Sequence, residues 1–213
     1  MHYLTKLFLN PVALREAEIR DDYSIHRLVY SCFPPSKAKI SDSRFLYADM
    51  GAVPGGRSLL ILSTGEPTPP AYVSSSSTIV SEAFLGFPEY RFEVDLNPVR
   101  RDAADGKRRA VTGQLELLQW FLAHASQWGF EADPRFLEVL SRPTRRFIRS
   151  ERAYTFNHAF FRGRLRVTEP ERFRRSFFAG LGHGKAFGFG LLRLRPCRVI
   201  ATSHEMEAND LSR

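Results

Sequence analysis

Residues 161–196 read FRGRLRVTEPERFRRSFFAGLGHGKAFGFGLLRLRP and carry the pattern that decides the fold. An alternating strand leads into a helix predicted over about 169–179, because Pro170 suits the first turn of a helix. The glycine-rich segment GLGHGKAFGFG, residues 180–190, joins this helix to a short strand at 191–195. A strand, a helix, a tight loop and a strand are typical of one half of an α+β domain.

The residues before this stretch predict the rest of a C-terminal domain, residues 113–196. Apolar residues recur at helical spacing over 113–128, and strand-like segments follow at 135–140 and 145–149. Together with the segment above, they form a βαββαβ-like order that begins with its helix. Residues 197–213 have no clear pattern and are expected to form a frayed tail.

An N-terminal domain is predicted over residues 1–97. Its helix is expected to begin near Asp21 or Asp22, either of which can serve as an N-cap. The expected strands are 3–9, 44–48, 58–63 and 90–96. The fold class is therefore α+β, with two tandem ferredoxin-like domains that resemble RRM folds, and a polar, basic linker at 98–112.

The charge of the chain is strongly basic and unevenly distributed. The formal net charge is +8, and five of the 31 basic residues are lysine, which leaves 31 − 5 = 26 arginines. Residues 1–99 carry 9 basic and 11 acidic residues, whereas residues 100–213 carry 22 basic and 12 acidic. A basic half of this kind favours a polyanion, either nucleic acid or an anionic membrane. A high-GC genome, which favours arginine codons, is an alternative explanation for the arginine excess.

No run of about 18 apolar residues occurs, so no membrane span is expected. The N-terminus has no signal-peptide pattern. The chain has two cysteines, Cys32 and Cys197, and two thiols in a chain of this length favour a reducing cytoplasm.

One face of the first predicted helix has residues suited to acid–base chemistry. Ile25, Leu28, Val29, Cys32 and Phe33 form its apolar stripe. Tyr23, His26, Arg27 and Tyr30 then share the opposite face, near a helix N-terminus that attracts phosphate. This arrangement favours general acid–base chemistry on a phosphodiester. A solvated helix face is the commoner outcome of such a pattern.

The loop at 180–190 holds five glycines in eleven residues. Glycine lets a backbone approach a ligand closely and direct its amides at phosphate, so Gly182 and Gly184 are candidate RNA contacts. Neither a Walker A pattern nor a dinucleotide-binding context is present. A tight connection between a helix and a strand is the alternative reading.

Three groups of basic residues are candidate RNA contacts, although charge runs are more often solvated faces. The first lies in the predicted linker, the second near a predicted hairpin, and the third alternates along one strand, so that its members share one face. They are, in order, Arg100, Arg101, Lys107, Arg108 and Arg109; Arg142, Arg145, Arg146, Arg149 and Arg152; and Arg162, Arg164 and Arg166.

Several kinds of chemistry lack support in the sequence. The chain has no HExxH motif, no paired-cysteine spacing and no acidic cluster of the kind a two-metal site needs, so we expect a metal-independent mechanism. It has no GxSxG elbow. Cys32 lies on the apolar stripe, where a buried, inert thiol is expected.

In order and spacing, these motifs resemble the CasE family of CRISPR repeat-processing endoribonucleases, which belong to the RAMP superfamily and to type I-E Cascade complexes. The resemblance rests on YLTKLFLNP from residue 3, Tyr23-x-x-His26-Arg27, Trp120, and above all residues 161–196. LNPVRR at 96–101 and GKRRAV at 106–111 add to it. One departure is His183, which stands where the family has proline.

The resemblance implies two RAMP-type domains and an enzyme that cuts precursor CRISPR RNA 3′ of the repeat hairpin. It implies attack by a 2′-hydroxyl, a 2′,3′-cyclic phosphate product, and no metal or other cofactor. The family's tyrosine and histidine fall on Tyr23 and His26. Lys185 is the candidate cation, and an arginine from 142–152 is nearly as plausible. Implied partners are the repeat RNA hairpin and other Cascade subunits, and the chain is expected to be monomeric outside that complex.

A RAMP subunit that holds an RNA hairpin without cutting it is the main rival, and the polar face with Tyr23 and His26 argues against it. A DNA-binding regulator is a third possibility, for which no helix-turn-helix pattern is present.

Overall fold

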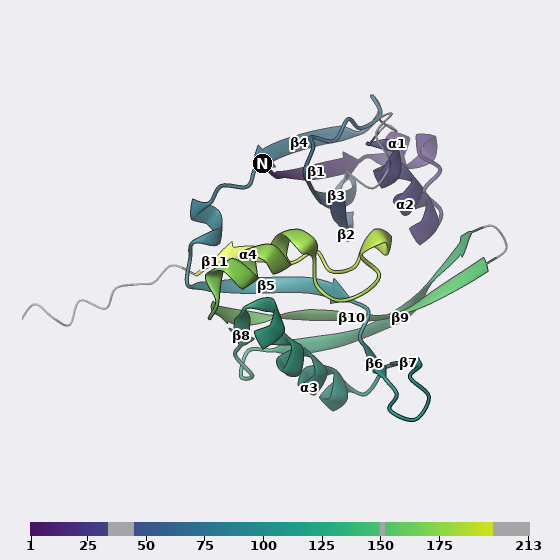
Figure 1. The fold of residues 1–213 in the computed structure, drawn as a ribbon. Helices are drawn as coiled ribbons and strands as arrows, with labels where there is room; N and C mark the ends of the chain where they lie inside the picture. Colours follow the sequence, from purple (N-terminus) through teal and green to yellow (C-terminus); the bar gives the residue numbers. More distant parts are fainter. Residues whose placement is uncertain (34–44, 150–151, 198–213) are drawn as a thin grey trace, which may run out of the picture.

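The computed structural model describes residues 1–33, 45–149 and 152–197. It consists of two sheet-based units stacked on each other (Figure 1). The strands of the first unit follow the order β2-β3-β1-β4, and all neighbours are antiparallel. Its elements are β1 (Tyr3–Leu9), α1 (Pro11–Glu16), α2 (Asp22–Ser31), β2 (Phe45–Val53), β3 (Gly56–Ser63) and β4 (Ser74–Ile79).

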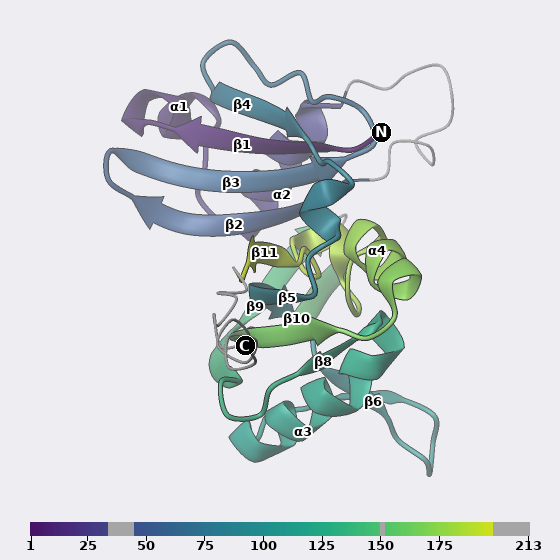
Figure 2. The same ribbon diagram turned by 90° about the vertical axis from the view of Figure 1, so that its left-hand side faces the viewer.

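This strand order is that of a ferredoxin-like unit in which an irregular connection, residues 64–73, replaces the second helix. Helices α1 and α2 lie behind the sheet in Figure 2 and pack on one of its faces. Residues of β3 alternate between two cores, because successive side chains of a strand point to opposite faces. Leu59 and Ile61 pack against α2, whereas Leu60 and Leu62 pack toward the second unit.

The second unit is a complete ferredoxin-like domain with strand order β11-β5-β10-β8, in which β9 also pairs with β10. Strands β8 and β9 together form one interrupted edge strand along β10. Helices α3 and α4 cover one face, where six buried phenylalanines gather: Phe92, Phe121, Phe130, Phe161, Phe173 and Phe177. The elements are β5 (Glu89–Leu96), β6 (Val99–Arg101), β7 (Arg108–Ala110), α3 (Gln114–Ala125), β8 (Phe130–Ala132), β9 (Glu138–Arg149), β10 (Arg152–Val167), α4 (Pro170–Ala179) and β11 (Arg193–Pro196).

The tandem ferredoxin-like fold is confirmed, but the predicted boundary after residue 97 is wrong. Strand β5 pairs with β10 and β11, so it belongs to the second unit. It is the strand that the predicted helix-first order of residues 113–196 lacked. The alternation of YRFEVDL identifies a half-buried strand, but it does not identify the strands it pairs with, because pairing is non-local.

The segment 98–112 is not a linker between domains. Strands β6 and β7 pair as a hairpin inserted between β5 and α3, inside the second unit. Residues 80–88, with a short 3-10 helix at Ala83–Leu85, connect the two units instead. The strands predicted at 135–140 and 145–149 are one strand, β9. Of the predicted tail, residues 198–213 lie outside the described part of the chain.

A shared apolar core joins the two units, since Leu46, Ala48 and Leu62 of the first sheet are buried in one cluster with Leu181 and the second sheet. None of the described helices is long and apolar enough to cross a membrane.

Candidate functional site

Helix α2 presents its polar face as the sequence predicted. Asp21 is the N-cap, because its carboxylate accepts a hydrogen bond of 2.8 Å from the Ser24 amide. Ser24 in turn accepts a bond from the Asp21 amide, which completes a capping box. Ile25 and Leu28 are buried on the core side. Their burial directs Tyr23, His26, Arg27 and Tyr30 away from the core of the first unit.

The apolar side of the same helix confirms the expectation for Cys32. Its side chain is 1% exposed, and burial raises the pKa of the thiol to about 11. A thiol with this pKa is almost entirely protonated at neutral pH, so it is a poor nucleophile.

The glycine-rich segment is a closed loop fastened to the end of β5. The Leu181 amide donates to the Gly190 carbonyl at 2.9 Å, and the Gly190 amide donates to the Asp95 carbonyl at 2.8 Å. Gly190 has φ +85°, and a β-carbon there would lie 2.4 Å from the Leu181 carbonyl oxygen. Only glycine can close the loop at this point.

The tip of the loop contacts helix α2, and this contact defines the candidate site. Nδ1 of His26 lies 2.8 Å from the carbonyl oxygen of Ala186. Since a carbonyl oxygen only accepts hydrogen bonds, Nδ1 carries a proton and donates it. Nε2 is then the ring nitrogen that can gain or lose a proton without breaking this bond.

Aromatic rings surround the imidazole. The Phe187 ring stacks on His26 with centroids 5.4 Å apart and an interplanar angle of 17°. Tyr30 lies at 4.1 Å and Tyr23 at 5.9 Å by the same measure. The ring of His26 is therefore oriented by the loop on one side and by its own helix on the other.

The two candidate cations differ in their surroundings. Burial lowers the pKa of the Lys185 ammonium below its usual range, and none of the ion pairs found among the described residues includes Lys185. Arg145 is only 13% exposed, lies 3.7 Å from the Asp22 carboxylate, and covers the Phe189 ring at 5.1 Å. Arg145 already supports the junction of β9, α2 and the loop, whereas Lys185 retains an uncompensated charge.

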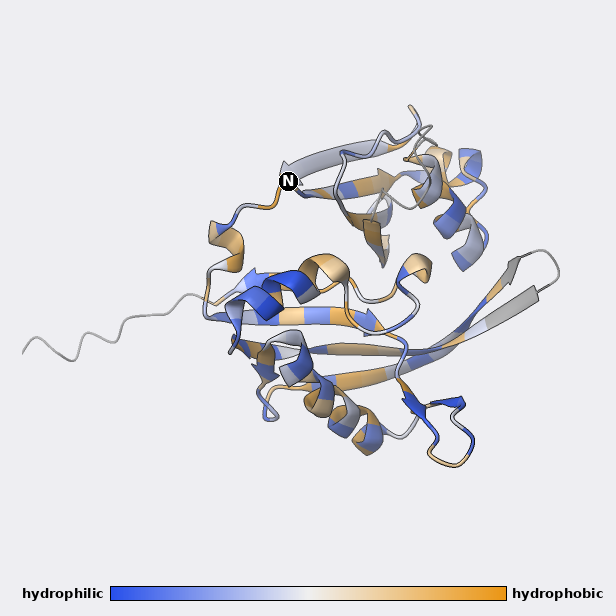
Figure 3. Ribbon diagram, viewed as in Figure 1, coloured by the Kyte–Doolittle hydropathy of each residue, from blue (hydrophilic) through white to orange (hydrophobic). Residues whose placement is uncertain are grey.

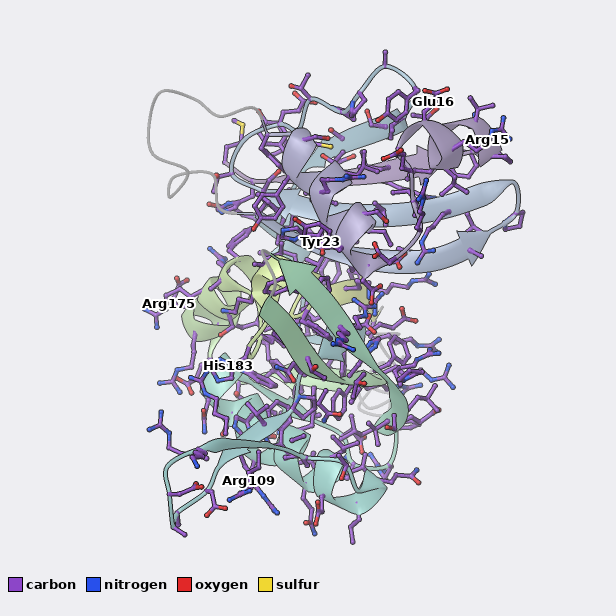
Figure 4. The ribbon with its side chains drawn as sticks, turned by 90° about the vertical axis from the view of Figure 1, so that its right-hand side faces the viewer. Arg15, Glu16, Tyr23, Arg109, Arg175 and His183 are labelled. Carbon is purple, nitrogen blue, oxygen red and sulfur yellow. The ribbon has the colours of Figure 1, made fainter. Side chains whose placement is uncertain are left out.

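His183 lies in a basic environment beside the same loop. Burial lowers its pKa, and the nearby charges of Arg108, Lys185 and His124 lower it further. Arg108 belongs to the β6–β7 hairpin, so the glycine-rich loop and this hairpin are close in space. Figure 4 shows Tyr23, His183 and Arg109 on the side of the molecule that faces the viewer.

The first predicted group of basic residues is exposed on the surface. All five project from the β6–β7 hairpin, which is strongly hydrophilic in Figure 3: Arg100, Arg101, Lys107, Arg108 and Arg109. Arg109 donates hydrogen bonds to Asp102 and Asp105, so it also stabilises the hairpin. Trp120 anchors the hairpin by donating to the Val99 carbonyl at 3.0 Å.

The remaining predicted RNA contacts differ in location and in their partners. Arg142 and Arg146 are exposed on β9, which forms the predicted hairpin with β10. The side chains of Arg149 and Arg152 lie outside the described part of the structure. Arg27 pairs with Glu18 at 3.3 Å on the surface. Gly182 and Gly184 both have positive φ and lie in the loop.

A buried ionic network surrounds Asp95, and the sequence patterns do not predict it. Asp95 accepts from Nε2 of His158 at 2.7 Å and from Arg193 at 2.9 Å. Burial alone raises the pKa of the Asp95 carboxyl, but the His158 hydrogen bond and the charges of Arg193 and Arg145 outweigh it, so the pKa lies below its usual range. Because the backbone of Asp95 holds Gly190, this network supports the base of the loop.

Neither the Ala186 carbonyl nor Asp95 gives a sequence signal, since one is a backbone atom and the other is a single acid on an alternating strand. In the described residues, no three side chains from His, Cys, Asp or Glu come together as ligands for a metal ion.

Comparison with known families gives one match that spans most of the chain. The profile of the family described as CRISPR associated protein matches residues 2–196. The chain belongs to this family. The match includes α2, the β6–β7 hairpin and the glycine-rich loop of this CRISPR-associated protein.

The similarity to individual relatives agrees with the resemblance to the CasE family. The CRISPR-associated endoribonuclease Cse3 of Thermus thermophilus is 34% identical over 118 residues, which are 50% of this chain and 55% of that protein. The alignment thus spans about half the length of this relative. The structure of Thermus thermophilus Cse3 bound to an RNA representing a pre-cleavage complex is 27% identical, with a TM-score of 0.76, over 92% of this chain and 99% of that one.

The fold alone is shared with CRISPR-associated protein Cas6e from Escherichia coli. That structure is 20% identical, with a TM-score of 0.68, over 92% of this chain and 100% of that one.

Proposed function

We propose that this CRISPR-associated protein is a metal-independent endoribonuclease that cuts precursor CRISPR RNA 3′ of the repeat hairpin. One observation carries the proposal: the loop carbonyl of Ala186 holds Nδ1 of His26 at 2.8 Å, on a helix face that also bears Tyr23. This contact sets the tautomer of an imidazole between a helix N-terminus and a basic loop. The similarity to Cse3, whose solved structure contains RNA, supports RNA as the substrate.

In this proposal, Nε2 of His26 transfers the proton. It acts either as the base that activates the upstream 2′-hydroxyl or as the acid that protonates the leaving 5′-oxygen. The 2′-oxygen attacks phosphorus, the bond to the 5′-oxygen breaks, and the products carry a 2′,3′-cyclic phosphate and a 5′-hydroxyl. Tyr23 orients the attacking group or donates a hydrogen bond to the phosphate.

Lys185 stabilises the negative charge that develops on the phosphate. It is preferred over Arg145 because Arg145 is paired with Asp22. A partly buried ammonium also interacts more strongly with a phosphate than a fully solvated one, since less solvent screens it.

The basic β6–β7 and β9–β10 hairpins bind the RNA. Exposed arginines on β6–β7 and on β9 contact the phosphates of the A-form repeat stem, which is recognised by shape and backbone. The product stays bound, and the chain joins the other subunits of the surveillance complex as a monomer.

The second candidate function is a non-catalytic RAMP subunit that binds the hairpin only. The held tautomer of His26 favours the enzyme, because simple hairpin binding does not need an oriented imidazole.

The test is cleavage of the chain's own repeat RNA in excess EDTA. We expect one cut, and His26→Ala should lower the rate at least about 10²-fold while hairpin affinity changes only a few fold. His2→Ala is the matched control, since it removes an imidazole that stacks on Phe178. A substrate with 2′-deoxyribose before the cut should bind and stay intact. Dependence on Mg²⁺, or cleavage of the deoxy substrate, contradicts the mechanism.

A further inference from the structure

The face of the second sheet opposite α3 and α4 carries an unusual row of charges. Antiparallel register places Arg91 of β5 directly opposite Arg164 of β10 on one side and Arg195 of β11 on the other. All three are exposed. Directly opposed side chains share one face and lie about 5 Å apart at their β-carbons, so like charges there repel each other. We call these three residues the arginine row.

The rows on either side of the arginine row are charge-compensated. One row places Glu93 between Arg162 and Arg193. The other places Arg166 between Glu89 and Glu131, and Arg166 pairs with Glu131 at 2.8 Å.

Within the described residues, no ion pair includes a member of the arginine row, whereas Arg162, Arg166 and Arg193 of the neighbouring rows pair with Glu138, Glu131 and Glu93. Arg164 of this row lies over an aromatic ring, since its guanidinium carbon is 4.2 Å from the centroid of Phe136. A bound anion would relieve the repulsion among the three opposed cations.

A cavity of about 590 Å³ lies over this face. Its lining includes the arginine row, Phe136, and Met50 and Leu60 of the first unit. It also includes two ion pairs of the neighbouring row, Arg162–Glu138 and Arg193–Glu93. Phe136 comes from residues 133–137, where the edge strand is interrupted between β8 and β9. Its side chain is exposed to solvent at 42%.

We propose that this cavity is a binding site for single-stranded RNA, with backbone phosphates on the arginine row and a base against Phe136. Arginine forks suit phosphate oxygens, and an exposed aromatic ring offers a stacking surface to any base. An acidic peptide would satisfy the arginines but leave the stacking surface unused. This inference rests on the proposed function only in taking RNA as the ligand.

The location suits a strand that leaves the repeat hairpin. Arg91 lies four residues from Asp95, whose carbonyl holds the glycine-rich loop. Four residues of a strand span about 14 Å. RNA at the α2–loop junction can therefore extend along β5 to the arginine row.

The test measures binding of a fluorescein-labelled oligouridylate of about ten nucleotides, without a hairpin, by anisotropy at several salt concentrations. Arg91→Ala should weaken binding about tenfold and lower the salt slope by about 0.7 for each phosphate that the variant no longer neutralises. The matched control is Arg166→Ala, which removes an equal charge from the same face but from a compensated row. Its affinity should stay within about twofold of wild type.

Arg91→Ala should also melt no lower than wild type, because it removes a repulsive neighbour. Equal losses of affinity in the two variants, or an unchanged affinity in Arg91→Ala, would overturn the proposal. So would an oligoglutamate that binds as tightly as the oligouridylate and loses affinity in Arg91→Ala. Cleavage of an unflanked repeat hairpin, assayed in parallel, separates the two proposals: binding without cleavage contradicts only the proposed function, and cleavage without binding contradicts only this site.

Discussion

Nδ1 of His26 donates to the backbone carbonyl of Ala186 across 2.8 Å, although the two residues are 160 positions apart in the chain. The histidine belongs to the first unit and the carbonyl to the second. The candidate site therefore exists only when the two units are packed together, and its chemistry depends on the shape of the glycine-rich loop.

The first prediction concerns that loop shape. Gly188 has φ +82°, and a β-carbon there would lie 2.8 Å from the ring of Tyr47. Gly188→Ala should displace the loop tip from His26 and reduce the cleavage rate at least about tenfold, since small misplacements of a catalytic group are costly. Single-turnover cleavage of repeat RNA measures this effect.

Gly51→Ala is the control for Gly188→Ala. Gly51 has φ +77°, but nothing lies within 4 Å of its β-carbon position. Both variants carry backbone strain of about 1–2 kcal/mol, and only one carries the clash. Equal cleavage rates would show that the loop tip does not orient His26.

The second prediction concerns the cation. Burial lowers the pKa of Lys185, so its charge is lost at a lower pH than that of an ordinary lysine. If Lys185 stabilises the transition state, the cleavage rate should fall as pH rises through this lowered pKa. Arginine stays charged throughout this range, so Lys185→Arg should move the fall to higher pH.

Exposed Lys6 supplies the control, since Lys6→Arg should leave the pH–rate profile unchanged. An alkaline limb that is identical in wild type and Lys185→Arg would remove Lys185 from the mechanism and leave Arg145 as the candidate.

The third prediction concerns the network below the loop. Asp95→Asn removes the carboxylate that His158 and Arg193 share, and removing one partner of a buried pair costs about 3–5 kcal/mol. Arg193 keeps a second carboxylate, that of Glu93 at 3.9 Å, so the cost falls mainly on His158. The pKa of Asp95 is lowered in the folded state, so the stabilisation is complete above the unfolded pKa and disappears as pH falls through the folded one. Urea unfolding should show a much lower free energy of unfolding than that of wild type at neutral pH, and a smaller difference between the two in acid.

Glu18→Gln tests whether the removal of any ion pair has this effect. Glu18 pairs with Arg27, and both side chains are more than half exposed, so unfolding free energy should barely change. A cost for Asp95→Asn that is independent of pH would show that its charge does not stabilise the fold.

The fourth prediction concerns the β6–β7 hairpin. Arg101 and Arg108 lie directly opposite each other, which concentrates positive charge without a carboxylate between them. The double alanine variant should weaken binding of the repeat hairpin and reduce the salt slope by about 0.9 for each phosphate that is no longer neutralised.

The hairpin variant removes two charges, and its comparison is the removal of one charge on α4, with the effects expressed per removed charge. Arg172 is exposed and pairs with Glu169, so Arg172→Ala should leave affinity and salt slope nearly unchanged. Equal effects would mean that net charge, and not the hairpin, governs RNA binding.

Local signals in the sequence were sufficient for much of the fold. The apolar stripe of α2, the N-cap at Asp21 and the alternation of β5 are decided by neighbours within a few residues, so they could be predicted. The assignment of β5 to the first unit was wrong, because the partners of this strand lie up to 106 residues away and do not affect its own alternation. The prediction of a linker at 98–112 was wrong for a related reason, since polar, basic residues are equally typical of an exposed hairpin.

The sequence by itself determined which chemical groups this CRISPR-associated protein has on α2 and in residues 180–190, because helical periodicity and glycine content are local properties. Only the tertiary structure decided that the Ala186 carbonyl orients His26, that Asp95 supports the loop, and that Arg91, Arg164 and Arg195 form one row. Each of these is a contact between segments far apart in the chain. Such contacts are set by packing and strand register, which no single segment encodes.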